Sequence, residues 1–61
     1  MKKLLYEYVI QELNFINMNR YWFDCYVSTD RKMTEEFLKI YRRKNPGVRY
    51  RVVRCVQWNF F

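Results

Sequence analysis

Apolar and polar residues alternate along Lys3–Leu13, the first long stretch of the chain. A period of two, with β-branched and aromatic residues, predicts a β-strand. Both faces of this strand carry apolar residues, so we expect the sheet to be covered on both sides. One face is formed by Leu4, Tyr6, Tyr8 and Ile10.

The segment Asn14–Asn19 contains three asparagines in six residues. Asn tolerates positive φ and hydrogen-bonds its own backbone, so this composition predicts a turn. The apolar residues of the same segment either fold back onto the core or form a loop tip that faces a partner. They are Phe15, Ile16 and Met18.

Alternation returns in Arg20–Thr29, which predicts a second strand. One face of this strand, which includes Trp22 and Tyr26, mixes aromatic and polar groups, as an exposed sheet face used for contact would. The set expected in the core is Tyr21, Phe23, Cys25 and Val27.

A helical period follows the second strand. The residues Ser28–Asp30 supply N-cap candidates, and Thr34 before two glutamates is an alternative start. Acidic residues in the early turns and basic residues in the last turn would match the helix dipole. The spacing i, i+4, i+7, i+8, i+11 predicts one packed face, made of Met33, Phe37, Ile40, Tyr41 and Lys44.

The end of this helix is set by proline. Because Pro46 disfavours helical geometry at Asn45, the helix should end at Lys44. The pair Pro46-Gly47 then favours the centre of a type II turn.

The remaining segment, Val48–Phe61, predicts a third strand that is basic at its start. Its apolar register switches near Val52-Val53, where we expect a bulge or an end of the cover over the sheet. The aromatic tail Trp58–Phe61 extends the strand and packs against the helix or a second subunit, or else it anchors a partner. The element order is β-β-α-β, an α+β domain with a three-stranded, mainly antiparallel sheet and one helix on one face. Strand one should lie at the centre.

Length and composition predict that the chain has a partner. The 61 residues form one small domain, 1–61, and 51% of them are hydrophobic and 21% aromatic. A core of this size supplies only about 3–5 kcal/mol, and so many apolar side chains exceed what it can hide. We therefore expect a homo-oligomer, in the simplest case a homodimer, or an obligate complex.

Charge is concentrated at one end of the chain. Residues 1–36 hold six acidic and five basic residues, whereas residues 37–61 hold seven basic residues and no acid. Arginine binds phosphate and carboxylate with a planar fork, and neighbouring aromatic rings could stack on bases. A solvated face is the plainer alternative. The candidate binding residues are Arg42, Arg43, Lys44, Arg49, Arg51 and Arg54, with Tyr50, Trp22 and Tyr26 beside them.

Catalytic patterns are absent from the sequence. There is no histidine, and one glycine cannot form a phosphate loop. Glu35 and Glu36 point about 100° apart on a helix, so their carboxylates do not converge. The two cysteines, Cys25 and Cys55, have no third metal ligand; we expect reduced thiols, with a single bridge possible if their strands are neighbours. We predict no enzyme activity, no metal and no cofactor.

Targeting signals are also missing. The start Met1–Leu5 is like a signal peptide, but Glu7 and Glu12 interrupt the apolar region that should follow. No run approaches 18 apolar residues, so no membrane span is predicted. We expect a soluble cytoplasmic protein.

Over residues 20–56 the sequence runs from a Thr-Asp…Glu-Glu-Phe-Leu helix through Asn-Pro-Gly into Val-Arg-Tyr-Arg-Val-Val. In this order, and in its richness in Asn, Lys, Tyr and Phe, it resembles small phage-encoded early proteins. The resemblance implies a stoichiometric inhibitor of a bacterial polymerase, nuclease, or CRISPR or other defence system. The positive charge departs from the acidic DNA-mimic type of inhibitor.

We therefore predict a phage-type inhibitor that acts in the bacterial host cell and binds a protein machine through arginine and aromatic contacts. The alternative is direct binding of nucleic acid or of an anionic nucleotide signal through the basic residues 42–54.

Overall fold

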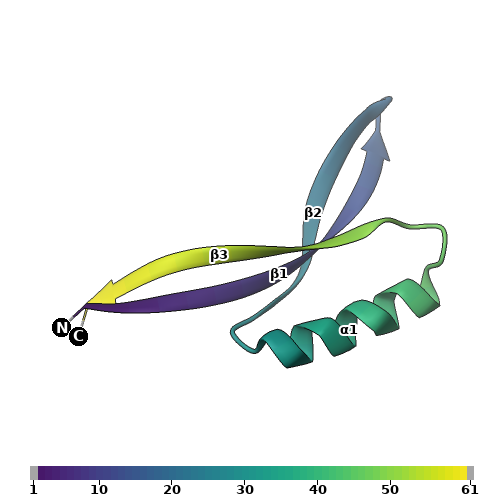
Figure 1. The fold of residues 1–61 in the computed structure, drawn as a ribbon. Coiled ribbons are helices and arrows are strands. Elements are labelled where there is room, and N and C mark those ends of the chain that lie inside the picture. Colours follow the sequence, from purple (N-terminus) through teal and green to yellow (C-terminus); the bar gives the residue numbers. More distant parts are fainter. Residues whose placement is uncertain (1, 61) are drawn as a thin grey trace.

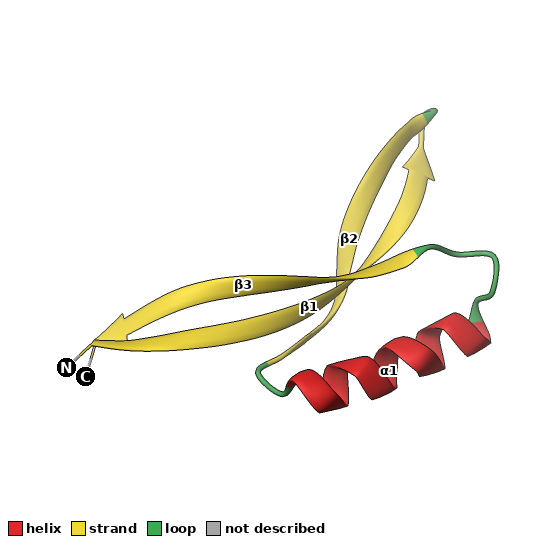
Figure 2. Ribbon diagram, in the orientation of Figure 1, coloured by secondary structure: helices red, strands yellow, loops and turns green. Residues whose placement is uncertain are grey.

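A computed structural model describes the backbone of residues 2–60 and the side chains of residues 5–56. The elements follow in the order β1 (Lys2–Ile16), β2 (Asn19–Ser28), α1 (Arg31–Lys44) and β3 (Tyr50–Phe60). The strands form one antiparallel sheet in the order β2-β1-β3, with α1 against one face (Figures 1 and 2). The predicted α+β architecture, with strand one in the centre, is confirmed.

The central strand β1 is shared unequally by its two neighbours. It pairs with β3 over Lys2–Glu12 and with β2 over Tyr8–Ile16, so three strands lie side by side only around Tyr8–Glu12. Beyond this overlap the sheet continues as two two-stranded arms, and the β1–β2 hairpin arm projects away from α1 (Figure 1). The Cα atoms span 45 × 27 × 10 Å, which leaves little interior volume.

The hairpin arm is longer than the sequence suggested. Strand β1 continues to Ile16, three residues past the predicted end, and the turn is only Asn17-Met18. Both turn residues have positive φ, 50° and 66°, the signature of a type I′ turn that matches the twist of the strands. Phe15 and Ile16 therefore lie in the strand and remain exposed, and Met18 at the tip is 100% exposed. They do not fold back onto the core.

A β-bulge lies in β2, not in β3. The β1–β3 register is continuous, so the bulge expected near Val52-Val53 is wrong. The β1–β2 register shifts between Ile10 and Gln11, where Ile10 faces Tyr26 and Gln11 faces Asp24. Cys25 is left over as the extra residue of the bulge.

The bulge reverses the alternation of side chains within β2. Tyr26 lies on the face covered by α1, which we call the helix face, whereas Trp22 lies on the opposite, open face. The prediction that Trp22 and Tyr26 share an exposed face is therefore wrong. Three of the expected core residues of this strand are instead exposed, namely Tyr21, Phe23 and Val27. Within the described chain no element covers the open face, so the predicted second cover would have to come from a partner.

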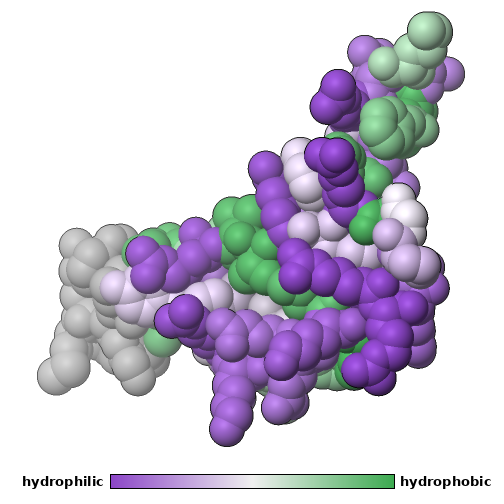
Figure 3. All heavy atoms as spheres, turned by 45° about the vertical axis from the view of Figure 1, so that its right-hand side comes forward, coloured by the Kyte–Doolittle hydropathy of each residue, from purple (hydrophilic) through white to green (hydrophobic). Residues whose placement is uncertain are grey.

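The core is correspondingly small. Among the side chains that the structure describes, the buried apolar ones are Val9, Ile10 and Tyr50. Ile10 is 0% exposed and lies between Tyr26 and Val52 on the neighbouring strands. Hydrophobic atoms instead reach the surface along the hairpin arm and near the middle of the molecule (Figure 3).

Helix α1 is rotated relative to the predicted packed face. Thr34 is fully buried, and Leu38 and Tyr41 are half-buried. The predicted residues Met33, Phe37 and Ile40 are partly exposed, and Lys44 is exposed. Phe37 keeps one contact with the sheet, through the Tyr26 ring at 4.6 Å between centroids. The small Thr34 side chain permits close approach to the sheet, which a pattern of large apolar residues does not reveal.

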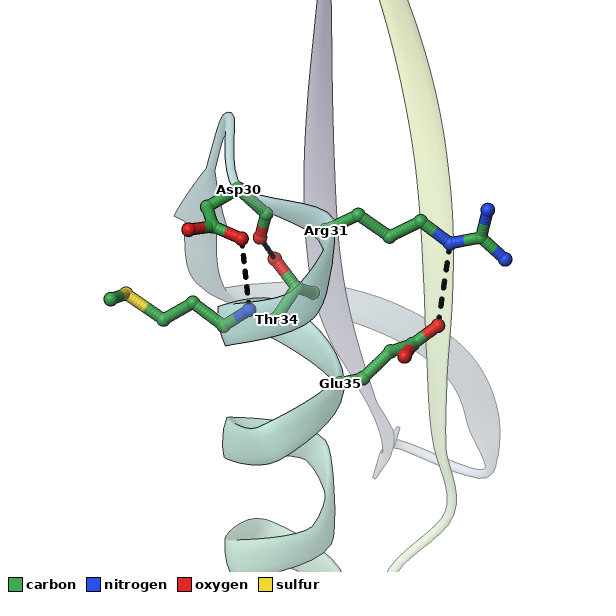
Figure 4. Close-up of polar contacts among 5 residues, drawn as sticks. Asp30, Arg31, Thr34 and Glu35 are labelled. Carbon is green, nitrogen blue, oxygen red and sulfur yellow. Dashed lines mark hydrogen bonds and ion pairs between the residues drawn. The ribbon is translucent and has the colours of Figure 1, made fainter.

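The helix begins at one of the predicted caps. The Asp30 side chain accepts a hydrogen bond from the Met33 backbone N–H at 3.1 Å, and the Thr34 hydroxyl donates to the Asp30 carbonyl at 2.8 Å (Figure 4). The alternative start at Thr34 is wrong. The first turn contains no acidic residue, and Glu35, expected there, forms an exposed ion pair with Arg31 at 3.3 Å.

The helix ends at Lys44, as predicted from the proline. The Asn45 backbone N–H donates to the Tyr41 carbonyl at 2.9 Å, and Val48 N–H donates to the Asn45 carbonyl at 3.1 Å to close a turn. A type II turn requires positive φ at Gly47, which Gly47 does not have, so that turn type is wrong. The aromatic tail predicted to pack or to anchor a partner has its side chains outside the described residues.

Candidate anion-binding groove

A groove of about 600 Å³ opens between the hairpin arm and the turn that follows α1. It collects residues from every element of the fold: Leu13, Arg20 and Trp22 from the arm, Arg42 from the last turn of α1, Pro46 and Val48 from the turn, and Arg49 and Tyr50 where β3 begins. A second hollow of about 570 Å³ shares Leu13, Arg20, Val48 and Arg49 with the groove. The two form one extended concave surface.

The pairing of β1 explains why these residues meet. Leu13 lies opposite Trp22, and Phe15 lies opposite Arg20. On its other edge, the Leu13 backbone N–H donates to the Arg49 carbonyl at 2.9 Å. The last residues of β1 therefore contact β2 along one edge and the start of β3 along the other, which brings the residues of the groove together.

The charge of the groove is not neutralised from within the described chain. Among the described residues, no carboxylate lies within ion-pair distance of Arg20, Arg42 or Arg49. Glu12 lines the adjoining hollow, but the groove itself is lined by three arginines and no acidic residue, and concave surfaces lined by one sign of charge focus the electrostatic potential. Three guanidinium groups around one groove therefore favour an anionic ligand.

Beside the groove, Arg51 is held in place on the open face. Its Nε donates to Gln11 Oε1 at 2.7 Å, and Gln11 Nε2 donates to Asp24 Oδ1 at 2.9 Å. The guanidinium carbon lies 4.1 Å from the centroid of Trp22, a cation–π distance. This chain of contacts crosses all three strands and fixes the indole at the groove wall.

Some of the predicted binding residues lie at the groove and others lie away from it. Arg42, Arg49, Tyr50 and Trp22 line the groove and Arg51 contacts its wall, whereas Arg43 and Lys44 are exposed outside its lining. Arg54 lies in a different hollow and over the Tyr6 ring, 5.1 Å from its centroid. Tyr26 packs under α1 and is unavailable to the groove. Of the predicted binding residues, Arg54 and Tyr26 therefore lie away from the groove.

Tyr50 has a structural role in this groove. Its side chain is buried, and its ring lies 5.5 Å from that of Tyr41. Burial raises the pKa of the phenol above its ordinary value of 10.0, and the nearby Glu12 carboxylate raises it further. Tyr50 therefore forms a neutral floor at physiological pH.

Arg20 is the groove residue that sequence reasoning missed. It lies in β2, before helix α1, whereas the predicted basic segment covers residues 42–54, and the residues around it carry no net charge. The signal that could have found it is the hairpin register, which requires the short turn at Asn17-Met18 to be recognised.

The cysteines do not contribute a reactive group to the groove. Both are free, and β1 lies between their strands, so Cys25 and Cys55 are not neighbours. The Cys25 thiol donates to the Ile10 carbonyl at 3.3 Å. Burial raises the pKa of this thiol above its ordinary value of 9.0, with a further contribution from Glu12, which disfavours the nucleophilic thiolate.

Among the described residues, no group of three or more His, Cys, Asp or Glu could hold a metal ion. No helix in that part of the chain is long and apolar enough to cross a membrane. No protein-family model, curated protein or solved structure matches this chain.

Proposed function

We propose that this chain is a non-catalytic binding protein that attaches to an acidic surface of a larger bacterial protein machine and inhibits it, as the phage-type proteins it resembles do. The observation that carries the proposal is the imbalance of apolar burial. Twelve large apolar side chains are exposed in the described part of the chain, against three that are buried. Surfaces of this kind are typical of protein interfaces.

The groove supports the acidic character of the partner. Arg42 and Arg49 lack an ion-pair partner among the described residues, and arginine binds carboxylates through two parallel hydrogen bonds. Phe15 and Met18 extend from the hairpin arm next to the groove and are exposed. A protein surface with carboxylates near an apolar patch would engage both features.

The Trp22–Arg51 contact favours a second candidate function, the binding of single-stranded nucleic acid. An indole beside unpaired arginines combines a stacking platform with backbone neutralisation, the pairing used by proteins that bind single strands. This candidate explains the groove but leaves the apolar surface of α1 and the hairpin arm without a role.

A salt titration distinguishes the two candidates. Binding of a labelled oligoglutamate peptide carrying one aromatic residue, and of a labelled oligothymidylate of equal charge, should be measured at 50 and 200 mM salt. The protein-binding proposal predicts that the peptide binds more tightly than the oligonucleotide and loses less affinity at the higher salt concentration, because its aromatic residue adds an apolar contact that salt does not screen. Tighter oligonucleotide binding, with a loss that rises steeply with salt, would favour nucleic acid instead.

A further inference from the structure

The outer edge of β2 is open along the hairpin arm. Strand β2 is at the end of the strand order, and the contacts that tie it to α1 involve Cys25 and Tyr26, at its far end. Its residues Asn19–Asp24 project with the arm, away from the helix (Figure 1). This stretch contains neither Pro nor Lys, which usually protect an edge strand from pairing. The bulge at Cys25 ends the regular edge on one side and the turn ends it on the other.

We propose that a second copy of this chain pairs antiparallel with this edge, about a twofold axis at Trp22, to make a continuous six-stranded sheet. An isologous contact places the same strand on both sides of the axis. With the axis at Trp22, Arg20 faces the partner's Asp24 and Asp24 faces the partner's Arg20. Two symmetry-related pairs of opposite charge therefore form across the interface.

This register is favoured over its neighbours because they no longer place Arg20 opposite the partner's Asp24. Moving the axis to Tyr21 would place Arg20 opposite the partner's Trp22, and moving it to Phe23 would place Arg20 opposite the partner's Tyr26. Both leave the charges without opposite partners. Cross-strand pairs of opposite charge stabilise a sheet, whereas unpaired charges at an interface disfavour the alternative.

The helix face of the same stretch is complementary as well. Tyr21 and Phe23 are 47% and 45% exposed, and their rings already contact each other edge-on at 6.4 Å. In the proposed register Tyr21 faces the partner's Phe23 and Phe23 faces the partner's Tyr21, so four aromatic rings cluster around the axis on one face of the sheet. This removes apolar surface from water that the small core cannot cover.

The dimer leaves the groove usable. Arg20 is taken up by the partner's Asp24, and Arg42 and Arg49 remain at the groove wall. Asp24 can serve both contacts because only its Oδ1 accepts from Gln11 among the described residues. The proposal therefore stands independently of the identity of the anionic partner.

Charge reversal tests the register directly. Arg20→Asp or Asp24→Arg alone would place like charges opposite each other, and we expect each to raise the dimer dissociation constant at least tenfold. The double variant Arg20→Asp/Asp24→Arg restores opposite charges and should restore the dimer. Sedimentation equilibrium at 150 mM salt measures the mass, because repulsion between chains of charge +6 is screened within about 8 Å there. A monomeric wild type at all concentrations, single variants that dimerise as well as the wild type, or a double variant that stays as weak as the single variants would overturn the proposal.

A disulfide at the axis provides a second measurement. In a Cys25→Ser/Cys55→Ser background, Trp22→Cys places two thiols opposite each other, where opposed Cα atoms lie about 4.5–5.5 Å apart and a disulfide can form. We expect mild oxidation to convert most of this variant into a covalent dimer. The matched control, Val27→Cys in the same background, lies beyond the bulge and should remain mainly monomeric on a non-reducing gel. Equal cross-linking of both variants would contradict the proposed axis.

Discussion

Arg51 lies over Trp22 with its guanidinium carbon 4.1 Å from the ring centroid, although 29 positions of sequence separate them. Strand β1 lies between the two, and Gln11 on that strand accepts a hydrogen bond from Arg51. The contact joins the two edge strands of the sheet across the open face. It therefore connects the basic third of the chain to the hairpin arm.

This contact should contribute to stability as well as to the groove. In a double-mutant cycle of Arg51→Met and Trp22→Leu, we expect a coupling energy of about 0.5–1 kcal/mol, the value typical of exposed cation–π pairs. Urea unfolding of the four proteins measures it. If the two substitutions were strictly additive, the stacked geometry would carry no energy.

The smallest change to the core should already be measurable. Ile10 is 0% exposed, so Ile10→Val should lower the free energy of unfolding by about 0.5–1.5 kcal/mol. Phe15→Leu is the control, since Phe15 is 69% exposed and its truncation should have little effect. Equal losses in urea unfolding for both variants would show that the burial pattern is wrong.

The hairpin turn contains a residue that opposes its own conformation. Met18 has φ of 66°, a left-handed value that costs a residue with a Cβ about 1–2 kcal/mol, and type I′ turns favour glycine there. We expect Met18→Gly to raise the stability by about 1 kcal/mol, after allowance for the greater freedom of glycine in the unfolded chain. A lower thermal midpoint would argue against the type I′ turn.

In the turn that follows α1, the opposite kind of substitution, from glycine to a residue with a Cβ, should be stabilising. Gly47 has no positive φ, and a Cβ at this position would meet no atom within 4 Å. Gly47→Ala should therefore stabilise the protein by about 0.4–1 kcal/mol, because alanine has less freedom in the unfolded chain. Destabilisation in thermal unfolding would instead indicate that this turn needs glycine.

These two turns show which parts of the fold the sequence determines locally. Pro46 ends the helix by steric exclusion, so its end at Lys44 was predictable from the sequence alone. The turn at Asn17-Met18 was not, because methionine is unfavourable there and the strand pairing overrides that preference. The bulge at Cys25 likewise depends on the alignment of two strands, which no single segment encodes.

The candidate site was predictable to the same extent. Arg42, Arg49 and Tyr50 could be identified because they combine charge and aromatic character near the turn, and Trp22 because it lies on the face of the second strand that mixes aromatic and polar groups. Tyr26 was misassigned because the bulge moved it to the other face, and Arg54 because strand β3 carries it away from the groove. Arg20 joins the groove only through the hairpin register, so composition gave no indication of it.

Alkaline pH should weaken the fold through Tyr50. Burial raises the pKa of its phenol, so the folded state keeps the proton that the unfolded state begins to lose near pH 10. The stabilisation is complete below that pH and is lost as the pH rises through the higher pKa of the folded state. Tyr50→Phe should reduce the fall in unfolding free energy between pH 9 and 11, measured with urea. A fall of unchanged size in the variant would assign it to other groups.

The central claim is that the groove, and not the positive charge as a whole, binds an anionic partner. It is tested most directly by comparing Arg42→Gln/Arg49→Gln with Arg43→Gln/Arg54→Gln, which remove the same charge inside and outside the groove lining. Affinity for the labelled oligoglutamate peptide should be measured at 150 mM salt by fluorescence anisotropy, with thermal unfolding as the check on folding. The account predicts at least a tenfold loss for the groove variant and less than a threefold loss for the control. Equal losses would show that net charge alone, without the groove, holds the ligand.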